Sequence, residues 1–137
     1  MVNNSYIAIA PRNETEAYVC WDLNQCYLQQ MSGQTNPFLI LYICDITDLN
    51  HDELRSSIVQ ASTIKTAPYS SLSSSVVNVA PKVKSYTFQS HVHDCYVSIP
   101  SLHRDYIAEL GCIGPDGEWL MLTQSMPLRM YPIHSNE

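Results

Sequence analysis

Apolar and polar residues alternate along much of this chain, a pattern typical of β-strands. The segments "SYIAIAP" (residues 5–11) and "EAYVCWDL" (residues 16–23) have an apolar residue at every second position, which indicates strands with one buried face. The polar "RNET" between them predicts a turn, so the two segments are a candidate hairpin. In the second segment Cys20 and Asp22 are expected to face outward.

A short helix and a central strand are expected next. The segment "NQCYLQQMSGQTNP" contains good helix formers followed by Gly33 and Pro37, which predicts one or two helical turns and then a loop. The following "FLILYICDI" (Phe38 to Ile46) is apolar on both faces. Such a run, rich in β-branched and aromatic residues, is typical of a central strand that is covered on both sides.

The middle of the chain has a different character. In "NHDELRSSIVQ" the spacing of Asn50 and Glu53 matches a capping box, and predicts a short helix from His51 to about Gln60. The serine-rich segment from Ala61 to about Lys82 has no clear period. Because no second core-forming segment flanks it, we interpret it as a mobile surface insertion within one domain.

Strands are predicted again in the C-terminal part, in "VKSYTFQS", "CYVSIP", "RDYIAELGCI", "EWLMLTQS" and the short "LRMYPI". The most specific local signal is the turn "IGPDGE". Pro115 and Asp116 suit the central positions of a type I turn, and Gly117 can take the left-handed conformation that follows. The range from Arg104 to Ser125 is therefore predicted to be a β-hairpin.

Six or seven short strands, with turns about every ten residues, favour an antiparallel β-sandwich. Tyr106 opens a strand after a loop that contains a proline. That is the setting of a tyrosine corner, in which the phenol hydrogen-bonds to the backbone upstream. The sequence thus predicts an immunoglobulin-like sandwich of about seven strands, with one or two short helices.

Composition limits the chain to one globular domain over residues 1–137. Hydrophobic residues make up 45% of the 137 residues and charged residues 15%, which suits a single buried core. The formal net charge of -6 repels phosphate backbones and anionic membranes, so neither nucleic acid nor membrane is expected as a partner. We expect a monomer or a weak homodimer.

The cysteine pattern and the first residues indicate a cytoplasmic protein. The five cysteines are widely spaced, with no C-x-x-C pair, as expected of free thiols in a reducing compartment. The first residues, "MVNNSYIAIAPRNE", lack a basic region followed by a long apolar one.

Several segments together resemble a known bacterial family, catalogued as domain of unknown function 4912. They are "AYVCWDL", "LYICDITDL" and "DCYVSIPSLHRDYIAELGCIGPDGEWLMLTQS", in this order. The resemblance covers roughly Glu16 to Pro127 apart from the middle insertion. It implies an immunoglobulin-like sandwich, but no catalytic activity, cofactor or ligand. Cys20 and Cys95 stand where family members often carry aromatic residues, so neither cysteine is expected to be functional.

The stretch "QSHVHDCYVSIP" raises the question of a metal site. In an extended chain His91 and His93 would lie about 6.6 Å apart, close enough to share one ion. Cys95 would lie about 13 Å from His91, too far to complete the shell from one strand. Val97 and Ile99 continue the side of Cys95, which therefore is expected to point into the core. His91 and His93 remain weak metal candidates, and we expect no cofactor.

Enzymatic chemistry has little support in the sequence. There is no G-x-S-x-G motif and no recognisable Cys/His signature. Asp105 with Glu109, or Asp45 with Asp48, could pair as general acid and base, but such pairs arise by chance in an acidic domain. We expect a protein without catalytic activity.

Aromatic residues offer two binding hypotheses. If Leu120 and Leu122 pack inward, Trp119 and Met121 lie on the outer sheet face beside Ile107, and form a surface typical of protein contacts. The opposite register would bury Trp119 in the core. The first hypothesis is therefore a protein–protein interaction module of unknown partner, which docks through a sheet face or through the insertion folding on contact.

The alternative is a carbohydrate-binding sandwich domain. It would use exposed aromatic rings as platforms, with Trp119, Tyr96 and Tyr18 as candidates. Sugar binding requires aromatic rings beside Asp, Asn or Gln side chains, whereas a protein contact is flatter and more aliphatic.

Overall fold

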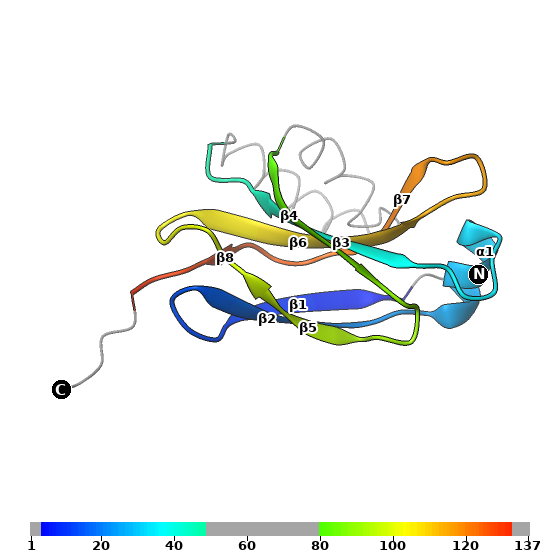
Figure 1. Cartoon of the computed structure of the whole chain (residues 1–137), viewed down its shortest axis with the longest axis horizontal. Coiled ribbons are helices and arrows are strands. Elements are labelled where there is room, and N and C mark those ends of the chain that lie inside the picture. Colours follow the sequence, from blue (N-terminus) through cyan, green and yellow to red (C-terminus); the bar gives the residue numbers. More distant parts are fainter. Residues whose placement is uncertain (1–3, 49–79, 133–137) are drawn as a thin grey trace, which may run out of the picture.

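Two antiparallel sheets pack face to face in this protein (Figure 1). The computed structural model describes residues 4–48 and 80–132 of the chain. The smaller sheet has the strand order β1 (Tyr6–Pro11), β2 (Glu16–Asp22), β5 (Asp94–Ser98). The larger sheet has the order β4 (Lys82–Phe88), β3 (Leu39–Asp45), β6 (Asp105–Ile113), β7 (Trp119–Gln124), and the short β8 (Leu128–Arg129) also pairs with β6. This arrangement confirms the predicted β-sandwich, while its immunoglobulin-like character stays a prediction.

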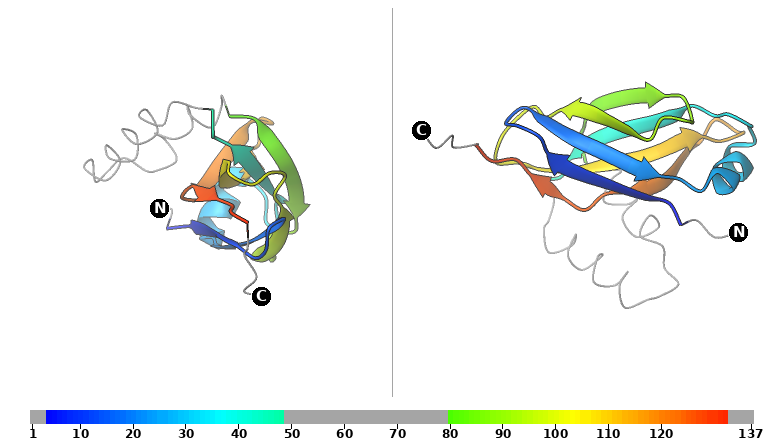
Figure 2. Two further views of the ribbon diagram at one scale, coloured as in Figure 1. Left: turned by 90° about the vertical axis from the view of Figure 1, so that its left-hand side faces the viewer. Right: turned by 90° about the horizontal axis from the view of Figure 1, so that it is seen from below.

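The three-stranded sheet forms one outer layer of the molecule. In the right-hand view of Figure 2, which looks onto the three-stranded sheet, β1, β2 and β5 lie in front of the strands of the larger sheet. β1 and β2 form the predicted hairpin, and β2 then pairs with β5 from the distant part of the chain. Residues of β2 and β5 that point away from the larger sheet therefore share one exposed face.

The hydrophobic core lies between the two sheets because inward positions of each strand are apolar. Leu39, Leu41 and Ile43 of β3 are fully buried, as are Val19 of β2 and Leu110 of β6. The strand predicted from Phe38 to Ile46 therefore contributes its inner face to this core. On its outer face a second, smaller cluster comprises Cys44, Ile46, Ala80 and Ile107.

The helix α1 (Gln25–Ser32) follows β2, as predicted, and both of its ends are capped. The Asn24 side chain accepts a hydrogen bond from the Tyr27 N–H at 3.1 Å, which satisfies one of the free N–H groups of the first turn. Gly33 ends the helix with φ of 71°, and donates its N–H to the Gln29 carbonyl at 3.0 Å. A left-handed glycine is the common way to stop a helix.

Two local predictions for the C-terminal half are confirmed. In the β6–β7 hairpin, the Gly114 N–H donates to the Glu118 carbonyl at 2.7 Å, and Gly117 has φ of 79°. The Tyr106 hydroxyl donates to the Ser101 carbonyl at 3.2 Å and accepts from the Ser101 N–H at 3.2 Å. The phenol thus closes the loop upstream of β6, as a tyrosine corner requires.

Part of the predicted middle region lies outside the described residues. These are the helix expected from His51 to Gln60 and residues 61–79 of the expected insertion. At the end of that insertion, Ala80 is buried and β4 already begins at Lys82. Within the described ranges, no helix is both long and apolar enough to cross a membrane.

Candidate functional site

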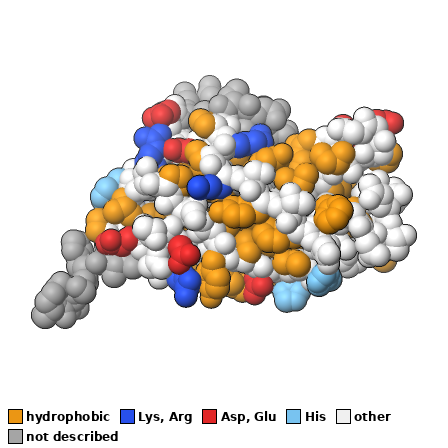
Figure 3. Space-filling model, viewed as in Figure 1, with side chains coloured by type: hydrophobic (Ala, Val, Ile, Leu, Met, Phe, Trp, Pro, Cys, Tyr) orange, Lys and Arg blue, Asp and Glu red, His pale blue; other side chains and the backbone are white. Residues whose placement is uncertain are grey.

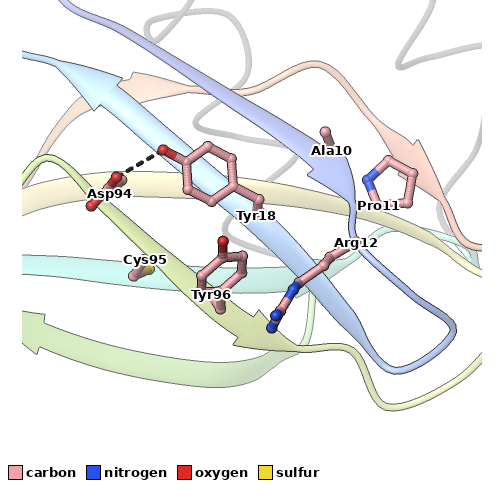
Figure 4. Close-up of a pocket in the computed structure, with 7 residues that line it drawn as sticks. All are labelled: Ala10, Pro11, Arg12, Tyr18, Asp94, Cys95 and Tyr96. Carbon is pink, nitrogen blue, oxygen red and sulfur yellow. Dashed lines mark hydrogen bonds between the residues drawn. The ribbon is translucent and has the colours of Figure 1, made fainter.

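A groove of about 450 Å³ lies on the outer face of the three-stranded sheet (Figure 4). It contains aromatic, basic and acidic side chains side by side, which is the combination that binding sites use to fix and orient a ligand. We call it the Arg–Tyr groove. Its lining residues are Ala10, Pro11, Arg12, Tyr18, Asp94, Cys95 and Tyr96.

The alternation of β2 and β5 places the groove residues on the same face. Neighbours along the strands, such as Val19 and Val97, are buried between the sheets, so Tyr18, Asp94 and Tyr96 point outward. The register then brings them together because Tyr18 lies opposite Tyr96. Residues that are far apart in the sequence become direct cross-strand neighbours, and such pairs interact.

The two tyrosines and the aspartate form a connected group. The ring centroids of Tyr18 and Tyr96 are 5.3 Å apart with an interplanar angle of 50°, within the range of attractive aromatic pairs. The Tyr18 hydroxyl donates to Oδ2 of Asp94 at 2.8 Å. This hydrogen bond to the carboxylate is the main cause that raises the pKa of Tyr18 to about 12. Tyr18 is therefore a neutral donor that fixes the position of the Asp94 carboxylate.

Arg12 completes the groove from the turn between β1 and β2. Its guanidinium carbon lies 4.2 Å from the centroid of the Tyr96 ring, a cation–π contact. Its Nη1 also donates to Oε1 of Glu16 at 3.1 Å. The turn is held by the Arg12 N–H, which donates to the Glu16 carbonyl at 2.9 Å. Backbone and side-chain contacts thus hold this long side chain over the ring.

The outer face of the larger sheet has a different composition. Leu120 and Leu122 pack on the core, so the register that places Trp119 and Met121 outward is the correct one. The Trp119 ring lies across Gly111, where an added Cβ would lie 2.7 Å from the indole. Trp119 also meets the Tyr42 ring edge-on, with centroids 5.0 Å apart. Trp119 and Met121 are both half-buried.

A buried carboxylate lies on this same outer face. Glu109 is 1% exposed, and neither of its oxygens has a hydrogen-bond partner in the described part of the chain. Burial raises the pKa of Glu109, and the Lys82 ammonium and the Trp119 side chain oppose this shift only in part. Lys82 itself lies over the Tyr42 ring, 5.1 Å from its centroid. An unpaired carboxylate at such a position costs stability when it is charged.

The four predicted contact residues are not on one surface. Ile107 is 1% exposed, so it has no surface to offer a partner. Trp119 and Met121 are half-buried beside it, on the larger sheet. Tyr96 is 53% exposed and belongs to the other sheet, where it lines the Arg–Tyr groove.

Sequence reasoning named neither Arg12 nor Asp94 as a contact residue for a partner. Asp94 and Tyr96 alternate with Cys95 and Val97 in the sequence, and this alternation could have indicated that they share an outward face. Nothing local indicated that Arg12, from a turn, would reach a ring of β5.

The two candidate metal ligands precede a strand rather than lie within it. His91 is in the turn after β4, His93 comes just before β5, and both are exposed. Val92 between them packs against the core, and its carbonyl accepts from Nε1 of Trp21 at 3.0 Å. Cys95 packs against the core, as expected. Among the described residues no group of three or more His, Cys, Asp or Glu side chains is placed to hold a metal ion.

The carboxylates considered for acid–base chemistry are mostly in ion pairs. Arg104 binds Asp45 through Nε and Asp48 through Nη2. Asp105 accepts from Nε and Nη2 of Arg129 at 2.7 and 2.9 Å. Such paired carboxylates position loops and strand ends, so the contacts give these residues a structural explanation.

Comparison with known families agrees with the resemblance seen in the sequence. The model of the family described as Domain of unknown function (DUF4912) matches residues 69–137, half of the chain. The chain belongs to this family. The matched range includes β4 to β8, and so the Asp94 and Tyr96 side of the groove, but not β1 and β2 with Arg12 and Tyr18. None of the curated proteins matches the chain.

Proposed function

We propose that this member of the DUF4912 family is a non-catalytic protein-interaction module of the bacterial cytoplasm, and that it binds its partner through the Arg–Tyr groove. The observation that carries the proposal is the connected row of Arg12, Tyr96, Tyr18 and Asp94 on an exposed sheet face. Tyrosine and arginine are among the residues that contribute most of the binding energy at protein interfaces. The five free cysteines fit the proposed reducing compartment.

Preorganisation supports a protein partner. Arg12 is held by Tyr96 and Glu16, and Tyr18 is held by Asp94, so little side-chain freedom is lost on binding. The face of the molecule in Figure 3 carries hydrophobic side chains over its middle and right part, and its acidic and basic side chains are intermixed, mostly in the left half. Neither this surface nor the composition has the basic stripe of a nucleic-acid site.

A sugar ligand is the second candidate because Asp94 lies beside the Tyr18 ring. An aromatic ring next to a carboxylate is what carbohydrate recognition requires. The position of Arg12 favours a protein instead, since the guanidinium covers a face of Tyr96 on which a sugar ring would have to stack. A glycan-array hit that is lost in Asp94→Ala would favour the sugar over the protein.

The test compares proteins that co-purify with the wild-type chain and with two variants. Tyr96→Ala removes the central ring of the groove. Phe38→Ala is the matched control, because Phe38 is an aromatic residue of similar exposure (62%) that precedes β3 of the other sheet. We expect a reproducible partner that is lost with Tyr96→Ala and retained with Phe38→Ala. A partner retained by both variants would contradict the proposed site.

A further inference from the structure

The charges around the Arg–Tyr groove do not balance. Arg12 is paired with Glu16 at 3.1 Å, whereas Asp94 accepts a hydrogen bond from the neutral hydroxyl of Tyr18. No cation pairs with Asp94 in the portion of the chain that the structure describes. Together, Arg12, Glu16 and Asp94 therefore carry a net negative charge, and the unbalanced charge is that of Asp94.

The aromatic side of the groove already binds a cation. The Arg12 guanidinium lies 4.2 Å from the Tyr96 centroid, so this ring contacts a positive charge within the molecule itself. The Tyr18 ring is next to it, at a tilt of 50°, and carries the hydrogen bond to Asp94. A cation that contacts the Tyr18 ring would have the Asp94 carboxylate within its reach.

Asp94 is preorganised to accept hydrogen bonds from such a cation. Its Oδ2 is occupied by the Tyr18 hydroxyl, which fixes the orientation of the carboxylate in Figure 4. The other oxygen, Oδ1, has no hydrogen-bond donor among the described residues. A guanidinium can stack on an aromatic ring and donate to a carboxylate at the same time, which an ammonium does less well.

We infer that the Arg–Tyr groove binds an arginine side chain of the protein partner, with its guanidinium on the Tyr18 ring and hydrogen-bonded to Asp94. This inference rests on the proposed function and names the chemistry of the partner. The net charge of the chain, -6, supports it, because an acidic domain attracts a basic segment over long range. Lysine is expected to bind the same place more weakly.

The test uses two synthetic peptides and amide chemical shifts of the ¹⁵N-labelled protein. The first peptide has nine residues of glycine and serine with one central arginine and blocked ends. The second has citrulline, which has nearly the same shape without the charge, in place of the arginine. We expect the arginine peptide to shift amides of β2 and β5 around Tyr18 and Asp94. Equal shifts with the citrulline peptide, or shifts confined to other strands, would overturn the inference.

Two charge-removing variants give the matched comparison. Asp94→Asn is expected to weaken binding of the arginine peptide about three- to ten-fold, through loss of an exposed ion pair in an aromatic setting. Asp116→Asn removes the same charge from the β6–β7 turn and is expected to leave the affinity unchanged. Equal affinities of Asp94→Asn and wild type would overturn the assignment of Asp94.

The outcome separates this inference from the proposed function. If the arginine peptide fails to bind while Tyr96→Ala still abolishes partner capture, the groove docks a protein by other chemistry and only the inference is wrong. If the peptide binds through Asp94 but partner capture does not depend on Tyr96, the proposed function is wrong and the arginine site stands.

Discussion

Glu109 provides a sharp test of the energetics of this fold. The side chain is 1% exposed and neither oxygen has a hydrogen-bond partner within the described ranges. Burial raises the pKa of Glu109 above its ordinary value. In the unfolded chain a glutamate titrates near pH 4.3, so above that pH the unfolded state ionises more readily than the folded state. The contribution of protonated Glu109 to the free energy of unfolding is therefore fully present below about pH 4. It is lost as the pH rises through the raised pKa of the folded state.

The substitution Glu109→Gln removes the charge and keeps the shape. The neutral amide is equally unpaired, so at pH 4, where Glu109 is protonated, variant and wild type are expected to have similar free energies of unfolding. At pH 8 the variant is expected to be more stable by about 1 to 3 kcal/mol. Only the wild type must then either bury a charge or keep a proton that the unfolded chain has released, a cost that the Lys82 ammonium reduces. For a domain of this size the gain in stability corresponds to a rise in Tm of about 4 to 12 °C.

The assay is urea denaturation followed by tryptophan fluorescence at pH 4, 6 and 8. Glu118→Gln is the matched control, since Glu118 is exposed. The Glu118 carboxylate accepts a hydrogen bond from the Asp116 N–H at 3.1 Å, and the side-chain amide oxygen of the variant can still accept it. The control is expected to change the free energy by less than about 0.5 kcal/mol at every pH. If Glu109→Gln were less stable than wild type, or if its advantage did not grow between pH 4 and pH 8, the buried Glu109 carboxylate would not be a destabilising charge.

Three further predictions concern other parts of the fold. Tyr106→Phe, which removes two hydrogen bonds with Ser101, is expected to lower the free energy of unfolding by about 1 to 2 kcal/mol in urea denaturation. Gly111→Ala is expected to lower Tm by at least about 4 °C in a thermal melt, because its Cβ would clash with the backbone carbonyl oxygen of Leu120. At pH 8, mass spectrometry is expected to find alkylation of the exposed Cys26 and protection of the buried Cys44, whose pKa is raised to about 12 mainly by burial.

Each of these predictions has a result that contradicts it. Tyr6→Phe, at a tyrosine that is 55% exposed, is the control for Tyr106→Phe, and equal losses in both would remove the special role of Tyr106. Gly117→Ala introduces a Cβ with no atom within 4 Å, although its φ of 79° is unfavourable for alanine. If it destabilised more than Gly111→Ala, the close approach of the Leu120 carbonyl to Gly111 would not be the dominant effect. Alkylation of Cys44 as fast as Cys26 would contradict the burial of the second cluster.

Much of the fold was accessible from local pattern. Alternation in residues 16–23 predicted β2, and the "IGPDGE" turn predicted the β6–β7 hairpin, because both signals lie within a few consecutive residues. The capped helix α1 likewise needs only Asn24 and Gly33, which are close to each other in sequence. Such elements are determined by neighbouring residues, so one sequence is enough to find them.

The groove could not be predicted because it depends on long-range pairing. Tyr18 and Asp94 are 76 residues apart, and only the register of β2 with β5 brings them together. The conditional prediction for Trp119 shows the same limit: alternation defines two faces but not which one meets the other sheet. For Ile107, alternation gave the correct outer face, but could not reveal that this part of the face is buried.

Site-specific photo-cross-linking in the living cell would show whether a partner protein binds at the Arg–Tyr groove. Ser98 lies on the outer face of β5, two residues beyond Tyr96, and is exposed, so a benzophenone amino acid in its place would lie beside a bound partner. The control carries the same benzophenone amino acid in place of Ile113, which is 41% exposed and lies on the other sheet. We expect a protein adduct of defined mass from position 98 and none from position 113. An adduct from position 113 alone would contradict binding at the groove.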